Sequence, residues 1–288
     1  MEKKNVDNNN VEVTENKETN WKLKLYRWTN SYPLIGRRGI SGSTLKILAI
    51  ILMTIDHVGA GLVLRYCNML MSSYQTLPNW KESYDHYFEI YEQLRWIGRF
   101  SFPIFVFLIV EGFKNTGNIW KYMKRLAIFA ILSEVPFDLC FFGKVMDFQK
   151  QNVFFELLLG VFMMKTLDEL KDRMFEDGRY LVVAVLFPIL AAALAEGFFL
   201  DYGFFGIMSI LIVYLASRNR LLQLLTGSLS FLWEMPAPLG FLPIIFYNGE
   251  RGLKLKYIFY LFYPLHLLAI AYIAYKMGIF EYVTLIVE

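Results

Sequence analysis

Charged side chains are scarce in this chain. Only 19% of its 288 residues are Asp, Glu, Lys or Arg, whereas 56% are hydrophobic. A soluble domain of this length would expose far more charge, so the composition excludes an ordinary soluble globular protein. The formal net charge of +3 is also too small to indicate a nucleic-acid partner.

Cysteines and familiar catalytic motifs are equally sparse. Cys67 and Cys140 are the only cysteines, and they form neither a CxxC motif nor a zinc-binding spacing. The sequence has no GxxxxGK[ST], GxSxG, HExxH or HxxxxD motif and no repeated region. We therefore expect no metal site and no chemistry of these motif classes.

Long apolar runs dominate the sequence. We predict spans at residues 45–65, 95–113, 123–142, 153–170, 180–199, 202–217, 221–234, 237–248 and 257–275. About 20 apolar residues cross a hydrocarbon core of ~30 Å. The seventh and eighth runs are short and contain or adjoin Pro236, Pro238 and Pro243, so a count of eight stays open. The prediction is an all-α, polytopic transmembrane helix bundle of about nine spans, multi-pass in the cell membrane.

Residues 1–40 are expected to form a polar arm outside this bundle, with 41–288 as a single transmembrane domain. The first twenty residues are rich in Asn, Glu and Lys, a composition typical of disorder. Residues 21–28 combine aromatic and basic side chains, which suits an interfacial segment on an anionic leaflet. A short solvated helix leading into the bundle fits residues 21–28 equally well.

Lysine and arginine gather in alternate connections between the runs. They occur before the first span and in the second, fourth, sixth and eighth connections, whereas the odd connections are poorer in cations or net acidic. The positive-inside rule then predicts a cytoplasmic N-terminus and an external C-terminus. Nine spans satisfy this alternation throughout, and eight would break it at the end.

Several ionisable side chains fall inside the apolar runs. Such groups cost about 3 kcal/mol or more in a membrane, so each is a candidate functional residue. A helical rise of about 1.5 Å per residue places the following at similar depth: Asp56, His57, Arg99, Glu134, Asp138 and His266.

An imidazole with an acidic partner can act as a general base, because the acid orients the ring and stabilises the imidazolium. Adjacent helical residues point about 100° apart, so Asp56 need not bond His57. Asp56 can pair with Arg99 instead, leaving Glu134 or Asp138 for His57. The alternative is that these groups are ion pairs and polar links between helices, which for His266 is the simpler role.

Three short segments predict special backbone. Pro103 follows Arg99 by one turn, and Pro136 lies between two acids, so kinks are expected at both prolines. Residues 201–203, Asp-Tyr-Gly, predict a tight outer turn between the fifth and sixth spans. A plain hairpin with small-residue packing is the simpler interpretation of that turn.

Several of these segments resemble motifs of the TraX family. The resemblance lies in Met53–Gly59, Leu94–Phe105 with Glu111–Phe113, Lys121–Leu126, Asp201–Gly203 and Phe262–His266, and covers about residues 45–270. The family is named for a conjugative-pilus protein that acetylates the pilin N-terminus. It is grouped with integral membrane acyltransferases that move acetyl groups from cytoplasmic acetyl-CoA to acceptors outside.

The resemblance implies acetyl transfer here, with His57 as the matching histidine. Acetyl-CoA would be the donor, and the acceptor an amine or hydroxyl of a peptide, glycan or lipid. Asp56, Glu134 or Asp138 would stabilise the imidazolium, and Arg99 would hold Asp56 or an anionic part of a ligand. Four inner cations are candidates for the phosphates of coenzyme A, although positive-inside topology explains them without a ligand: Lys46, Lys121, Lys124 and Arg125.

Two other function classes stay open. Intramembrane charges on kinked helices also suit a transporter or flippase, although no inverted repeat is visible. A non-enzymatic membrane subunit for assembly of a surface appendage is the other alternative.

Overall fold

The computed structural model describes residues 38–73, 79–174, 179–253 and 256–283, together with Asn30 and Leu34. Within these ranges every regular element is a helix, and the only β-type pairings there are two isolated bridges. The predicted all-α class is therefore confirmed. The predicted disordered arm and its basic aromatic segment lie outside the described residues, apart from a few positions near the first helix.

The helices follow one another along almost the whole described chain. The α-helices are α2 (Gly42–Val58), α3 (Leu64–Ser72), α4 (Trp80–Gly98), α5 (Ser101–Lys114), α6 (Ile119–Phe141), α7 (Val153–Met174), α8 (Arg179–Gly197), α9 (Gly203–Leu215), α10 (Arg220–Leu229) and α11 (Lys256–Lys276). A π-helical turn, η1 (Gly59–Val63), joins α2 to α3, and the 3-10 helices are η2 (Ala216–Arg218), η3 (Ala237–Phe241) and η4 (Pro243–Phe246).

Four helical segments among the described residues are long and apolar enough to cross a membrane. They are Gly42–Ser72, Trp80–Lys114, Arg179–Gly197 and Tyr257–Lys276. Helices α6 and α7, with 23 and 22 residues, are also long enough for a ~30 Å core but carry more charged side chains. Segments of this length and composition are those of a membrane protein.

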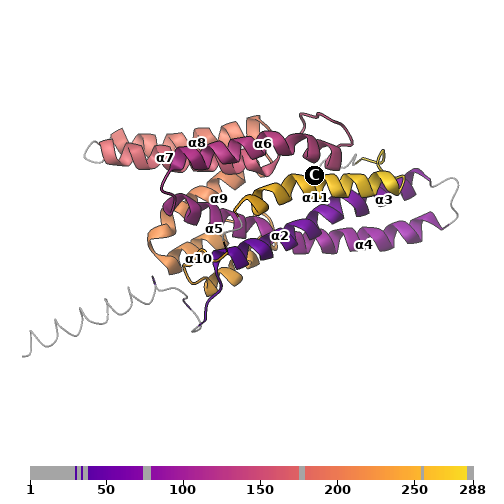
Figure 1. The fold of residues 1–288 in the computed structure, drawn as a ribbon, viewed down its shortest axis with the longest axis horizontal. Helices are drawn as coiled ribbons and strands as arrows, with labels where there is room; N and C mark the ends of the chain where they lie inside the picture. The colour runs from indigo at the N-terminus through magenta and orange to yellow at the C-terminus, as the bar shows by residue number, and fades with distance from the viewer. Residues whose placement is uncertain are drawn as a thin grey trace, which may run out of the picture.

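The helices lie in two layers with a packed group at one end (Figure 1). The first layer contains α2, α3, α4 and α11, and the second contains α6, α7 and α8. Helix α11 packs against α6, which joins the layers, and α9 packs against α8, α7 and α5. Helix α5 is the most enclosed, since ten of its 14 residues are buried.

Polar side chains begin several of these helices. The Asn118 side chain accepts a hydrogen bond from the backbone N–H of Lys121 (2.8 Å) at the start of α6, and Asn219 accepts one from Leu222 (3.0 Å) at the start of α10. Such caps satisfy backbone donors that a helix leaves unpaired. Pro103 lies in the first turn of α5, where no backbone donor is needed, so it starts this helix and the break falls at residues 99–100. Pro136 lies inside α6, which continues through it to Phe141.

Contacts between distant segments define one end of the bundle. Ile40 bridges to Tyr247, and the Nζ atom of Lys114 donates to the backbone oxygen of Ser217 (2.8 Å). Arg220, two residues after η2, lies over the Tyr247 ring (5.5 Å), so the start of α2, the end of α5 and the end of α9 lie together. We call this the Ile40 end.

Other contacts define the opposite end. The buried Arg65 guanidinium donates to the backbone oxygens of Phe280 and Cys140, both at 2.7 Å. Gln151 bridges to Leu200, which joins the loop before α7 to the loop after α8. We call this the Arg65 end.

The segment 220–247 differs from the prediction of two separate spans. Helix α10 has ten residues and is about 15 Å long, too short to cross. Turns at 230–236 follow, and η3 and η4 then lead back, so that Arg220 donates to the backbone oxygen of Ile244 (3.0 Å) and lies over the Tyr247 ring (5.5 Å). Both ends of the segment therefore lie at the Ile40 end, and we call residues 220–247 the hairpin.

The prolines explain why the hairpin turns back. Pro236, Pro238 and Pro243 lack the backbone donor that a continuous helix needs, and the chain forms turns and 3-10 helices around them. Because the two predicted spans are lost as a pair, the chain leaves the hairpin on the side where it entered.

Arg220 should be the main anchor of the hairpin. It is 2% exposed, donates to Gln223 (2.9 Å) and Ile244, and lies 4.3 Å from the Phe107 ring centroid. We expect Arg220→Met to lower the free energy of unfolding by about 3 kcal/mol, because charge-assisted hydrogen bonds are lost and acceptors stay buried. Thermal unfolding in detergent, with the exposed Arg218→Met as control, measures this; equal stability of both variants would contradict it.

Candidate functional site

Two histidines from opposite parts of the sequence meet in the bundle. His57 lies in the last turn of α2 and His266 near the middle of α11. The Nδ1 atom of His57 is 2.8 Å from the Nε2 atom of His266, and the two rings lie edge to edge with centroids 5.0 Å apart and an angle of 9° between their planes. Sequence reasoning named both residues but assigned them no contact with each other.

The hydrogen bonds of this pair fix which nitrogens carry protons. The Nδ1 atom of His266 lies 2.9 Å from the backbone oxygen of Phe262, which can only accept, so Nδ1 donates. In the neutral ring Nε2 of His266 then has a lone pair, and His57 donates to it through Nδ1. The Nε2 atom of His57 is left as the unprotonated nitrogen of the pair.

Aromatic rings enclose His57. Phe141 and Tyr263 approach its ring edge-on, with centroids 5.2 and 6.0 Å away. The π-helical turn η1 follows directly, a distortion that is frequent at functional sites. Within it, a side chain at Gly61 would collide with Cys140 and Ile270, so α2 needs glycine to approach α6 and α11.

Two ion pairs connect α2, the α4–α5 junction and the hairpin. Asp56 pairs with Arg95 (2.5 Å), and Arg99 pairs with Glu234 in the turns of the hairpin. The printed partner of Asp56 is therefore Arg95, one turn before the Arg99 considered from the sequence, and the Asp56 side chain turns toward α4. Gly98 makes this possible, since a side chain there would overlap Asp56.

Arg95 and Glu234 are site residues that sequence reasoning missed. Arg95 lies one helical turn before Arg99 in the same motif, and that spacing was the available signal. Glu234 was an acid at the end of a short, proline-interrupted apolar run. Its side chain is 12% exposed, and its Oε2 atom is buried without a hydrogen-bond partner among the described residues.

The predicted turn at residues 201–203 reaches these ion pairs. Tyr202 stacks flat on Phe102 at 3.5 Å and lies within electrostatic range of Asp56, Arg95 and Glu234. Residues 201–203 therefore contribute a side chain to the site as well as turning the chain. We define the polar centre as Asp56, His57, Arg95, Arg99, Tyr202, Glu234 and His266.

Glu134 and Asp138 lie in a different polar cluster. Glu134 accepts a hydrogen bond from the Asn152 side chain, and Asp138 accepts one from the backbone N–H of Asp147 (2.9 Å). In the described part of the chain, no hydrogen bond or ion pair joins either acid to His57. Their predicted role as its partner is not supported, since both hold the loop 142–152 against α6.

The same loop contains a titrating pair outside the helices. Lys144 donates to Asp147 (2.7 Å), and this hydrogen bond is the main reason that the pKa of Asp147 is lowered. Because the folded-state pKa is depressed, the contribution of the pair to stability is present above the ordinary pKa of Asp. It is lost as the pH falls through the lowered value.

Two of the four candidate phosphate-binding cations converge at the start of α11. Lys46 lies over the ring of Phe259 (5.6 Å), and Arg125 bonds Tyr260, the next residue along α11. The other two, Lys121 and Lys124, are exposed on the first turns of α6. The structure therefore brings all four to the Ile40 end and places Lys46 and Arg125 beside adjacent residues of α11.

The two cysteines are buried free thiols. Across the described ranges, no group of three or more His, Cys, Asp or Glu side chains is placed to hold a metal ion.

Breaking one ion pair of the polar centre should destabilise the fold. We expect Arg99→Met to lower the free energy of unfolding by about 2 kcal/mol, because Glu234 is then left charged and enclosed. Adding Glu234→Gln should restore part of that loss. Unfolding in detergent measures both, with Arg251→Met in an exposed loop as control. If adding Glu234→Gln to Arg99→Met lowered the free energy of unfolding further, as an independent substitution would, the pairing would be contradicted.

Comparison with known proteins places the site within one family. The profile of the TraX protein family matches residues 41–274, which include every residue of the polar centre. The chain is 27% identical over 257 residues to a protein of Dichelobacter nodosus named probable fimbrial assembly protein FimC, serogroup H1. That alignment covers 79% of this chain and 93% of the relative, and no solved structure matches. The match over most of the chain shows that it belongs to the TraX protein family.

Proposed function

We propose that this protein is an integral membrane acyltransferase that moves an acetyl group from acetyl-CoA to an acceptor amine or hydroxyl. The observation that carries the proposal is the His57–His266 pair, in which Nε2 of His57 is the free base. The neutral partner takes the place that an acid holds in a Ser-His-Asp triad.

The reaction would run through His57 as general base. The acceptor N–H or O–H donates to Nε2 of His57, and the nucleophile attacks the thioester carbonyl as its proton moves to that nitrogen. The imidazolium shares its charge with His266 through the Nδ1–H bond. The tetrahedral intermediate then expels the coenzyme A thiolate, which takes the proton from Nε2 to give the thiol and an acetylated acceptor.

The ion pairs would supply the electrostatics of this step. Arg95 and Arg99 place positive charge where an oxyanion develops, while Asp56 and Glu234 keep the resting site close to neutral. The free Oε2 atom of Glu234 is available to accept a hydrogen bond from the acceptor. These charges are arranged before the substrates bind, which avoids reorganisation in the transition state.

The donor would approach from the Ile40 end. Its phosphates would meet Lys46, Lys121, Lys124 and Arg125, and its thioester would reach His57, eleven residues after Lys46 or about 16 Å along α2. With this donor site, the Ile40 end would be cytoplasmic. The resulting topology has seven crossings and the hairpin, an internal N-terminus and an external C-terminus.

A non-enzymatic role in fimbrial assembly is the second candidate. The name of the Dichelobacter nodosus relative supports such a role. In that case the polar centre would link helices and would not need a free base.

Activity of single-histidine variants separates the two candidates. In vesicles supplied with radiolabelled acetyl-CoA and total host membrane, we expect His57→Ala to lower label transfer roughly a hundredfold or more, because the base is lost. His266→Ala should lower transfer less, since the base remains but is no longer oriented. His86→Ala is the matched control, because His86 is exposed on α4 and the chain has only 3 histidines.

Two results would contradict this assignment. An active His57→Ala protein with a dead His266→Ala protein would place the base on α11. Full activity of both would favour the assembly role.

Labelling of introduced cysteines tests the topology. In a background with both native cysteines replaced, a membrane-impermeant thiol reagent added outside should label the Gln149→Cys variant at once. It should label the Gly117→Cys variant only after permeabilisation, because residues 115–118 lie at the Ile40 end. Gly117 has open space around it, so this substitution introduces no clash. The reverse labelling pattern would invert the proposed orientation.

A further inference from the structure

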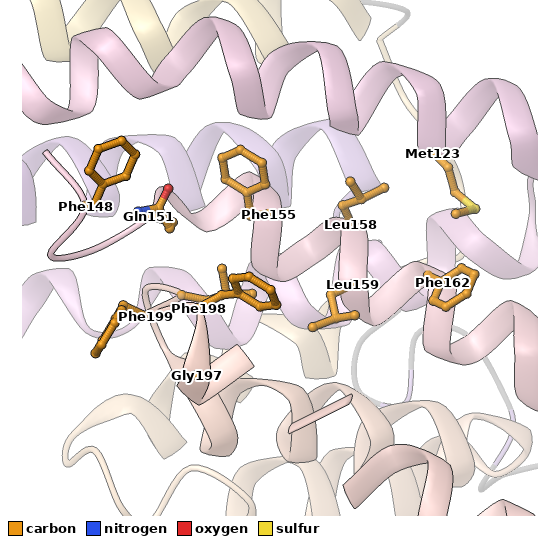
Figure 2. A pocket seen from close by; sticks show the side chains of 11 residues that line it. Met123, Phe148, Gln151, Phe155, Leu158, Leu159, Phe162, Gly197, Phe198 and Phe199 are labelled. Atoms are coloured by element: carbon orange, nitrogen blue, oxygen red, sulfur yellow. The ribbon is translucent and has the colours of Figure 1, made fainter. Parts of the chain in front are cut away.

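An apolar groove runs along α7 on the side away from the polar centre. Its volume is about 660 Å³, within the range of roughly 300–1,000 Å³ found for ligand sites. Figure 2 shows the lining side chains facing one another across it. They come from α6, from the loop before α7, from α7, and from the end of α8 with the residues that follow it, and include Met123, Gln151, Phe155, Phe162, Gly197 and Phe199.

Helix α7 separates the groove from the polar centre. Phe155, Leu158, Leu159 and Phe162 follow an i, i+3, i+4, i+7 pattern and line the groove. Glu156, one residue after Phe155, instead faces the core and accepts from the backbone N–H of Tyr202 (3.4 Å). One face of α7 therefore lines the groove, and another face packs in the core.

One rim of the groove has a strained backbone. Phe199 has a φ of 54°, which bulky residues rarely adopt, yet its ring is 60% exposed. Neighbouring Phe198 is 66% exposed. The strain therefore does not bury the ring of Phe199, and both rings stay available at the rim.

The end of the groove at Gln151 connects to the polar centre through charged residues. Lys150 precedes Gln151, and Asp201 follows Leu200. Asp201 lies within electrostatic range of both Lys150 and Arg95. A molecule whose apolar part lies in the groove would thus have its polar end beside the turn that leads to the polar centre.

The lining of the groove favours a hydrocarbon chain with one polar end. An acyl chain has no backbone polar groups that need hydrogen-bond partners, whereas an extended peptide segment has them at every residue. The lining is apolar except for Gln151 at one end, which matches a chain with a single polar head.

We propose that the groove binds a hydrocarbon chain of a lipid acceptor, whose head group carries the hydroxyl or amine that reaches the polar centre past residues 198–202. The acceptor assignment rests on the proposed acyl transfer, whereas chain binding does not. Two measurements therefore test the two parts separately.

Chain binding is measured without any chemistry. The full-length protein in nanodiscs receives a phospholipid with a photoreactive acyl chain, and crosslinked peptides are mapped. We expect crosslinks in α7 and residues 197–200, reduced about fivefold by Leu159→Trp, which fills the groove. Leu190→Trp is the matched control, because Leu190 is 56% exposed on α8 and does not line the groove. The proposal is overturned if Leu159→Trp leaves the crosslinks unchanged, or if the crosslinks are concentrated around Leu190.

A second variant guards against misfolding of the first. Phe199→Gly removes a rim ring, and its φ suits glycine, so this protein should fold at least as well as the parent. We expect it to lower crosslinking in the groove as well. Unchanged crosslinking in a folded Phe199→Gly protein would also overturn the proposal.

The acceptor is identified by where label from acetyl-CoA goes. We expect the lipid extract to contain it and Leu159→Trp to lower that fraction, while Leu190→Trp does not. Label found only in protein refutes the lipid acceptor and leaves the proposed acyl transfer standing. No label on any fraction, with groove crosslinks intact, refutes acyl transfer itself and with it the acceptor assignment.

Discussion

Charge pairing inside a bundle of apolar helices is the constraint on which this structure depends. Arg95 and Arg99 lie one turn apart on a long apolar segment, and each needs an anion nearby. Asp56 meets the first need from α2, across a glycine that leaves room for it. The second is met by the hairpin, which enters from the Ile40 end far enough to bring Glu234 to Arg99. The short helix α10 and the prolines after it thus together place the Glu234 carboxylate inside the bundle.

The pairing leaves the histidines to each other. With Asp56 committed to Arg95, His57 has a neutral imidazole as its partner, and the Phe262 carbonyl orients that imidazole in turn. A neutral partner stabilises an imidazolium less than a carboxylate does, so the protonated state is favoured mainly while an anionic transition state is present. This suits the proposed acyl transfer, in which the base would return its proton to a departing thiolate.

Sequence reasoning found the fold class and four of the seven residues of the polar centre, because a membrane limits the length and polarity of the helices that can cross it. Apolar length revealed the helices, and ionisable residues within it revealed Asp56, His57, Arg99 and His266. Pairing could not be deduced, because a helix gives depth but not the direction in which a side chain turns. Glu134 and Asp138 have a depth similar to that of His57 yet bond the loop 142–152. Glu234 was missed because its segment was interpreted as a membrane span. Its position depends on the chain turning back within the hairpin, and the length of an apolar run does not indicate such a turn.

The protonation of His57 is the most direct test of this account. Nitrogen-15 spectra of the three histidines in nanodiscs, with His57→Ala and His266→Ala for assignment, report which ring nitrogens carry protons. We predict that His57 at neutral pH is protonated at Nδ1 and unprotonated at Nε2, with a coupling to Nε2 of His266 across their hydrogen bond. A proton on Nε2 of His57, or a His57 spectrum that His266→Ala leaves unchanged, would contradict the account.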